Sequence, residues 1–175
     1  QKKMSELTEN QIKFSDYTEA DFETLSWNEH IRRRSGMYIG KLGDGSSPDD
    51  GLYILFKEIV DNAIDEFIMG HGKSVKMSID KENLVTVRDH GRGIPLDYNE
   101  KEERYNWELV FCDLYAGGKY NTNEGGSYEY SLGLNGLGSC ATQYASEFFD
   151  VTVRRDGFRY DLHFEKGRVK GKMKK

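Results

Sequence analysis

The stretch EIVDNAIDE at positions 58–66 places four acidic side chains and one amide within nine residues. Positions four apart share a helix face, so Glu58 and Asn62 are expected to be neighbours, beside an apolar stripe of Ile59, Ala63 and Phe67. The amide oxygen of Asn62 suits a Mg²⁺ ion that already carries phosphate. Glu58 is suited to accept a proton from water. The stretch predicts either a site at the edge of a core or an acidic, solvated helix face.

A second candidate element is RDHGRGIP at positions 88–95, which follows the apolar stretch VTV. A strand that ends in Asp89 places a carboxylate at the rim of a pocket. Gly91 and Gly93 allow a flat ligand to approach the backbone closely. A carboxylate in this position can accept a hydrogen bond from the exocyclic amine of adenine. The alternative is that Asp89 is a turn residue, since Asp-His-Gly is common turn chemistry.

A third element is the glycine-rich stretch SLGLNGLGS at positions 131–139, which precedes a short helical pattern. It fits neither the dinucleotide-binding pattern nor the P-loop pattern. Successive backbone N–H groups and a helix N-terminus nevertheless form an anion cradle. Lys119, in Ala-Gly-Gly-Lys, is the candidate cation for such a site. A flexible loop would have the same composition, so both interpretations stay open.

Charge and composition narrow the class of protein. The chain has 175 residues and a net charge of -5, which argues against a broad grip on nucleic acid. Arg32, Arg33 and Arg34 form either a local basic patch or a solvated helix face. No signal peptide or membrane-length apolar stretch is visible. Cys112 and Cys140 lack metal-ligand spacing and predict reduced thiols in a cytoplasmic protein.

Hydrophobic periodicity predicts the elements that position these side chains. Ser26 and Glu29 have the spacing of a capping box at the start of the first helix. Asp156-Gly157 is a hairpin turn signal between two alternating runs. The expected elements are helices over 25–34, 50–69, 107–115 and 139–146, strands over 75–79 and 84–87, and a hairpin of 149–153 with 158–164.

The order of the motifs RRRSGMYIG, EIVDNAIDE, HGRGIP and AGGKY resembles the ATPase family shared by DNA gyrase, heat-shock chaperones, histidine kinases and mismatch-repair proteins. Within it, the motifs are most similar to the N-terminal ATPase domain of the gyrase B subunit or its topoisomerase IV equivalent, over about residues 25–167. The resemblance implies an α+β fold, a two-layer sandwich of helices on a mixed, mostly antiparallel sheet. Residues 1–24 would be an N-terminal arm, and 25–175 an ATP-binding domain without its C-terminal strands.

The resemblance also implies roles for individual residues. Glu58 corresponds to the general base that polarises the attacking water, and Asn62 to the Mg²⁺ ligand that bridges to the phosphates. Asp89 corresponds to the carboxylate that binds adenine. The implied lining of the adenine pocket is Ile59, Ala63, Gly93, Ile94 and Pro95.

The border and lid of this implied pocket involve further residues. Arg92 and Glu66 would border its mouth, and Arg155 corresponds to the arginine that aminocoumarin inhibitors contact. The implied lid over the ribose and phosphates contains Lys119, Tyr128, Leu134, Asn135, Gly136, Leu137 and Gly138.

The sequence departs from the family pattern in several places. Ile54 stands where many relatives have a histidine one turn before the glutamate, and LNGLG at 134–138 lacks the histidine of the usual glycine loop. The lid has a small insertion near residues 122–126. A strand with a threonine near adenine is expected after Gly167 but is not present. We therefore expect this chain to bind nucleotide or inhibitor as a monomer and to hydrolyse ATP slowly or not at all.

For the whole protein, the resemblance implies an ATP-dependent type II DNA topoisomerase. ATP would drive homodimerisation that gates DNA passage, and the partners would be DNA and the DNA-cleaving subunit. The motifs fit gyrase and topoisomerase IV alike. Two alternatives stay open: another branch of the superfamily, such as a chaperone or histidine kinase, or a non-enzymatic acidic module that binds a cation or a partner.

Overall fold

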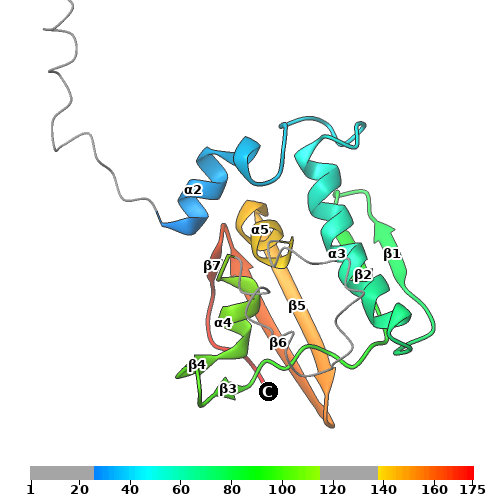
Figure 1. The fold of residues 1–175 in the computed structure, drawn as a ribbon, viewed down its shortest axis with the longest axis vertical. Helices are drawn as coiled ribbons and strands as arrows, with labels where there is room; N and C mark the ends of the chain where they lie inside the picture. The colour runs from blue at the N-terminus through cyan, green and yellow to red at the C-terminus, as the bar shows by residue number, and fades with distance from the viewer. Residues whose placement is uncertain (1–25, 115–137) are drawn as a thin grey trace, which may run out of the picture.

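A computed structural model describes residues 26–114 and 138–175 of the chain (Figure 1). Its helices are α2 (Trp27–Arg33), the 3-10 helix η2 (Ser35–Met37), α3 (Gly51–Ile68), α4 (Asn106–Phe111) and α5 (Gly138–Ala145). Its strands are β1 (Lys76–Ile79), β2 (Val85–Arg88), β3 (Tyr98–Asn99), β4 (Arg104–Tyr105), β5 (Phe148–Arg155), β6 (Phe158–Glu165) and β7 (Arg168–Val169). None of these helices is long and apolar enough to cross a membrane.

The strands form three small antiparallel sheets, β1-β2, β3-β4 and β5-β6-β7. The β5–β6 hairpin is the longest pairing and runs from Phe148↔Glu165 to Arg155↔Phe158. Asp156 and Gly157, at its turn, have φ values of 52° and 80°. Two positive φ values are what a two-residue hairpin turn needs to match the strand twist. The predicted hairpin is therefore confirmed.

The main core lies on one face of the β5–β6 hairpin. Inward residues alternate along both strands, and helix α4 covers this face through Phe111. The buried members are Leu96, Phe111, Val153, Tyr160, Leu162 and Phe164. A second cluster of Ile31, Cys140 and Tyr144 joins α2 to α5, with Cys112 and Leu114 packed against it. The fold is thus α+β, with helices packed against antiparallel sheets.

Two predicted helices agree closely with the structure. Helix α3 begins and ends within one residue of its predicted bounds. At the start of α2, the backbone N–H and the hydroxyl of Ser26 both donate to Glu29 Oε2, at 3.2 and 2.6 Å. This confirms the capping interaction. The helix predicted over 107–115 is shorter in the structure, where α4 ends at Phe111.

The prediction of an apolar stripe on α3 was partly wrong. Ala63 is buried, but Phe67 is 55% exposed. Two acids, Asp61 and Asp65, are buried instead, and Asp61 accepts a hydrogen bond from Lys57 one turn earlier. Two carboxylates of the acidic stretch are therefore buried, whereas part of the apolar surface of α3 is exposed to solvent.

The β1 and β2 strands are largely exposed. Met77, Ile79 and Val85 have exposed fractions of 54%, 66% and 43%. The alternation correctly predicts the strands, with Met77 paired to Val87 and Ile79 to Val85. Their sheet has only two strands and touches α3 mainly along β2, so little covers its apolar face.

All three arginines of the triplet are exposed, but Arg32 also bonds to another element. The Arg32 guanidinium donates to the carbonyl oxygens of Tyr144 and Ser146, each at 3.1 Å, and pairs with Glu147 at 3.3 Å. A cation that binds the last carbonyls of a helix satisfies acceptors that have no partner within the helix. Arg32 therefore fastens the end of α5 to α2.

We expect Arg32→Ala to lower the free energy of unfolding by about 1–3 kcal/mol, because two backbone carbonyls lose a charged donor. Arg32→Lys should recover part of this loss, since it keeps one donor and the charge. Urea unfolding, monitored by far-UV circular dichroism, measures the difference. Arg34→Ala is the matched control, because no described hydrogen bond involves its side chain. Equal unfolding free energies for the two alanine variants would contradict the fastening role of Arg32.

Candidate functional site

Helix α5 begins directly against Glu58 of α3. A Cβ atom added to Gly138 would lie 2.4 Å from Glu58 Oε2 and 2.8 Å from the Glu58 Cβ. Both contacts are too short for any side chain, so only glycine allows this approach. Thr142 strengthens the packing, because its hydroxyl lies 3.3 Å from the Leu55 carbonyl of α3 and 2.7 Å from the Gly138 carbonyl.

Glu58 has an environment that suits a proton acceptor. It is partly buried, and this desolvation raises the pKa of its carboxyl, with a further contribution from the neighbouring charge of Asp61. Lys57 acts in the opposite direction, and its effect is smaller. A carboxylate with a raised pKa is a stronger base toward water than an ordinary surface glutamate.

Asn62 lies one turn after Glu58 and also contacts α5. Its Nδ2 donates to the Ser139 hydroxyl at 3.1 Å, and its side chain is otherwise exposed. Because the amide nitrogen faces Ser139, the amide oxygen is the atom left for a metal ion. The sequence pattern had not identified Ser139 as a partner; its place directly after Gly138 was the available signal.

The donors around Asn62 fit Mg²⁺ only in combination with a phosphate ligand. Within residues 26–114 and 138–175, no group of three or more His, Cys, Asp or Glu side chains is arranged to hold a metal ion. Mg²⁺ commonly takes one or two protein oxygens and completes its shell with phosphate oxygens and water. One amide oxygen beside a helix N-terminus is compatible with that mode of binding.

Glu66 and Arg92 form an ion pair at the end of α3. Arg92 Nη2 donates to Glu66 Oε1 at 2.8 Å, and Arg92 Nε and its backbone N–H donate to Oε2 at 3.2 and 2.8 Å. This arginine holds the pKa of Glu66 below its usual range. A Cβ at Gly91 would lie 2.6 Å from Glu66 Oε2, so this glycine also permits a close approach. The structure thus brings together the two residues predicted at the pocket mouth.

Asp89 is exposed at the end of β2. Its Oδ1 accepts the backbone N–H of Gly91 at 2.7 Å, which is the turn interaction that the Asp-His-Gly sequence predicts. No hydrogen bond in the described part of the chain involves the other carboxylate oxygen, Oδ2. Asp89 can therefore keep its turn and still accept a hydrogen bond from a ligand.

The segment that follows Asp89 is held against the β5–β6 hairpin. Gly93 has a φ of 75°, and a Cβ there would lie 2.8 Å from the Arg154 carbonyl oxygen and 2.9 Å from Val153 Cγ1. Arg155 Nη1 donates to the Gly93 carbonyl at 2.7 Å. Ile94, at 37% exposed, and Pro95 lie at the surface.

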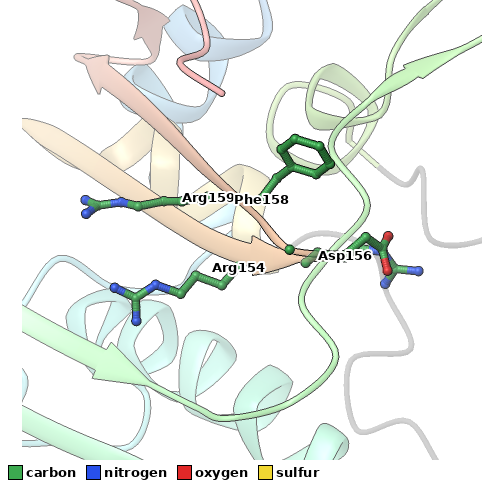
Figure 2. Close-up of a pocket in the computed structure, with 6 residues that line it drawn as sticks. Arg154, Asp156, Phe158 and Arg159 are labelled. Carbon is green, nitrogen blue, oxygen red and sulfur yellow. The ribbon is translucent and has the colours of Figure 1, made fainter.

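A hollow of about 370 Å³ opens beside the hairpin turn and is lined by residues 154–159 (Figure 2). Figure 2 shows Arg154 and Arg159 extending to one side of the hairpin and Asp156 to the other. Glu58, Asn62 and Asp89 do not line this hollow. Their candidate site is instead the surface of α3, which contacts the start of α5 near Glu58 and the 88–95 segment near Glu66. Arg155 is bonded to that segment through the Gly93 carbonyl.

The remaining predicted residues divide into two groups. Ile59 is partly buried and Ala63 is buried on α3, next to Glu58 and Asn62. Gly138 starts α5, as described above. Lys119, Tyr128, Leu134, Asn135, Gly136 and Leu137 lie outside the residues that the structure describes.

Comparison with known proteins assigns the family. Residues 48–167 match the sequence profile of the histidine kinase-, DNA gyrase B- and HSP90-like ATPases. The chain belongs to this ATPase family. The match spans α3, the 88–95 segment, α5 and the β5–β6 hairpin, which are the elements that form the site.

Relatives within this ATPase family belong to bacterial topoisomerases. The chain is 45% identical over 159 residues to the B subunit of DNA topoisomerase 4 from Borreliella burgdorferi, covering 90% of this chain and 24% of that protein. It is 40% identical over 152 residues to the B subunit of DNA topoisomerase 4 from Bacillus subtilis, covering 87% and 22%. It is 38% identical over 164 residues to the B subunit of DNA gyrase from Rickettsia felis, covering 94% and 19%. The chain thus spans a quarter or less of the length of these relatives.

A solved structure of the same ATPase family has a similar fold. It is the 43K ATPase domain of Thermus thermophilus gyrase B in complex with an aminocoumarin. The TM-score is 0.67 at 29% sequence identity, covering 86% of this chain and 34% of that chain.

Glu58→Gln should stabilise the folded protein at pH 7. The folded-state pKa of Glu58 is raised, so its ionised form is disfavoured by folding, and the amide removes that cost. The gain should vanish as the pH falls through the raised pKa, where Glu58 is protonated in the parent as well. Thermal unfolding between pH 4 and pH 8 measures this trend.

Glu66→Gln is the matched control with the opposite sign. The folded-state pKa of Glu66 is lowered by Arg92, so its ionised form stabilises the fold above the unfolded pKa. The variant should therefore be less stable than the parent at pH 7, and the difference should fade as the pH drops through the lowered pKa. The same pH trend in both variants would contradict the two environments described here.

Gly138→Ala should cost about 1–3 kcal/mol of stability, because the added methyl group overlaps Glu58 and forces α3 and α5 apart. In a Glu58→Ala background the cost should be smaller, since Oε2, the closest atom, is then absent. Chemical denaturation of the four proteins in this double-mutant cycle measures the coupling. Strictly additive costs would show that the two residues do not meet.

Proposed function

We propose that this chain is the ATP-binding domain of a bacterial type II DNA topoisomerase. The observation that carries the proposal is the meeting of Glu58 and Asn62 on α3 with the glycine-started helix α5. A potential base, a potential metal ligand and a helix N-terminus lie within one small region. The similarity to the B subunits of gyrase and topoisomerase IV supports the same conclusion.

The nucleotide base would bind at the Asp89 end of this region. The free oxygen of Asp89 would accept a hydrogen bond from the adenine amine, while its other oxygen maintains the turn. Ile59, Ala63 and the segment Gly93, Ile94 and Pro95 would supply the apolar walls. Guanine has no amine at the equivalent position, so this arrangement would favour adenine.

The phosphates would bind at the start of α5. The amide oxygen of Asn62 would hold a Mg²⁺ ion, which when bound neutralises phosphate charge and orients the transferred group. Glu58 would accept a proton from the attacking water. Gly138 and the neighbouring residues Leu134, Asn135, Gly136 and Leu137 would offer backbone N–H groups to the phosphates. Lys119 and Tyr128 would complete the lid.

Glu66, Arg92 and Arg155 would form the outer border of the pocket. The Arg92 guanidinium is oriented by two bonds to Glu66, and that of Arg155 by the Gly93 carbonyl. Planar cations of this kind can stack on or bind flat, polar ligands. We infer that Arg155 contacts aminocoumarins, since the similar gyrase B structure holds such a compound.

In the full-length protein, ATP binding would drive homodimerisation of the ATPase region and gate the passage of DNA in the cytoplasm. The partners would be DNA and the DNA-cleaving subunit. Residues 1–24 would form an arm that reaches the partner protomer, and 25–175 would be the ATP-binding domain. The sequence profile of the family begins at residue 48 and so leaves this arm outside its match.

The test is a calorimetric titration of the chain with ADP and with a non-hydrolysable ATP analogue, with and without Mg²⁺. Asp89→Asn should weaken adenine nucleotide binding about 10- to 100-fold, which corresponds to a charged hydrogen bond of about 1.5–3 kcal/mol. The introduced amide oxygen can still accept the Gly91 N–H, so the turn is preserved. Asn62→Ala should reduce only the gain that Mg²⁺ gives to the triphosphate.

Guanine nucleotides serve as the ligand control. Binding of GDP as strong as binding of ADP, or an unchanged affinity in Asp89→Asn, would count against an adenine pocket at Asp89. Binding of Mg²⁺ alone, without nucleotide, would instead support an acidic cation-binding module.

A further inference from the structure

The residues after β6 run back along its edge. Val169 in β7 pairs with Phe164, and the Lys170 N–H donates to the His163 carbonyl at 2.8 Å. Farther on, Lys174 and Asp161 exchange two backbone hydrogen bonds, each of 3.0 Å. These bonds fix the path of the segment and bring Lys175 to the β5–β6 hairpin.

The ammonium group of Lys175 lies in a small cation site. Its Nζ is 3.1 Å from Asp97 Oδ1, 4.5 Å from the ring centre of Phe158 and 5.1 Å from that of Tyr160. A carboxylate and two aromatic faces are the groups that stabilise an ammonium ion.

Asp97 is fully engaged in this cluster. Its Oδ2 accepts the Tyr160 hydroxyl at 2.8 Å, while Oδ1 takes Lys175. These two donors, Tyr160 first, hold the pKa of Asp97 below its usual range. Its backbone is also anchored, because the Asn106 N–H donates to the Asp97 carbonyl at 2.9 Å.

Asp97 ends the segment that begins at Gly93. The Gly93 end is held by Arg155 through the carbonyl bond of 2.7 Å. In the middle, Leu96 is 1% exposed and packs in the core with Tyr160. Ile94 and Pro95, the two residues proposed to face adenine, therefore lie in a segment that contacts the β5–β6 hairpin on either side of them.

We propose that Asp97, Tyr160 and Lys175 form a latch that positions the Gly93–Pro95 wall of the nucleotide pocket. This inference rests on the proposed function, and Asp97 and Lys175 act in it as positioning residues that do not touch the nucleotide. The latch has two parts: the backbone pairing along β6, which brings Lys175 into place, and the ammonium site, which fastens it to Asp97.

The size of the effect follows from exposure. The side chains of Lys175 and Asp97 are 44% and 56% exposed, so their pairing shifts an equilibrium only a few-fold. We expect Lys175→Met to weaken adenine nucleotide binding about threefold. Asp97→Asn should do the same, and the double variant should be no weaker than either single one, because both remove the same interaction.

Two further variants separate the latch from a general effect of charge. Lys175→Arg keeps a cation that can pair with Asp97 and stack on Phe158, so it should bind nucleotide as the parent does. Lys172→Met removes a lysine from the same segment, and no described hydrogen bond or ion pair involves Lys172. It should also leave binding unchanged. Calorimetry with ADP measures all of these variants, and with GDP it shows whether the adenine preference falls in Lys175→Met.

A second measurement needs no ligand. Backbone hydrogen exchange at Asn106, whose N–H donates to the Asp97 carbonyl, should be faster in Lys175→Met than in the parent, and unchanged in Lys172→Met. Suppose that the parent binds ADP and that Asp89→Asn does not. If Lys175→Met then has the same affinity and the same exchange rates as the parent, the latch is wrong but the nucleotide pocket is supported. If the parent binds no nucleotide, the proposed function fails, and unchanged exchange in Lys175→Met then overturns the latch as well.

Discussion

The close approach of α5 to α3 at Gly138 and Glu58 is the constraint on which the candidate site depends. Because position 138 has no side chain, the first turn of α5 can rest directly on the glutamate. The same approach brings Ser139 to Asn62 and the Thr142 hydroxyl to the α3 backbone. A wider separation would break all three contacts and move Glu58 and Asn62 away from the start of α5.

The acids of α3 illustrate how one short stretch supports several electrostatic roles. Glu58 is desolvated and its pKa is raised, whereas Glu66 is paired with Arg92 and its pKa is lowered. Asp61 and Asp65 are buried and contribute to the fold. When the environments of neighbouring carboxylates raise the pKa of one and lower the pKa of another, the two groups can have different roles in catalysis.

Local features of the sequence were sufficient for some elements but not for others. The Ser26–Glu29 cap, helix α3 and the Asp156-Gly157 turn depend on neighbouring residues, so their patterns predicted them well. The exposure of Phe67 and of the β1–β2 strands depends on which other elements pack against them. Hydrophobic periodicity carries no information about those elements. The pairing of Glu66 with Arg92 followed from the family pattern, whereas Lys175 with Asp97 spans 78 positions and carried no sequence signal.

The bonds from Arg32 to the end of α5 join residues 112 and 114 positions apart. Helix α5 has eight residues, too few to be stable in isolation, so it depends on α2 and α3 for its structure. Contacts between residues so far apart in sequence require the intervening chain to close into a loop, which costs conformational entropy. The start of α5 therefore takes up its position beside Glu58 and Asn62 only in the folded chain. A nucleotide bound there would be a ligand of the native state alone, and it would raise the free energy of unfolding by an amount that grows with nucleotide concentration.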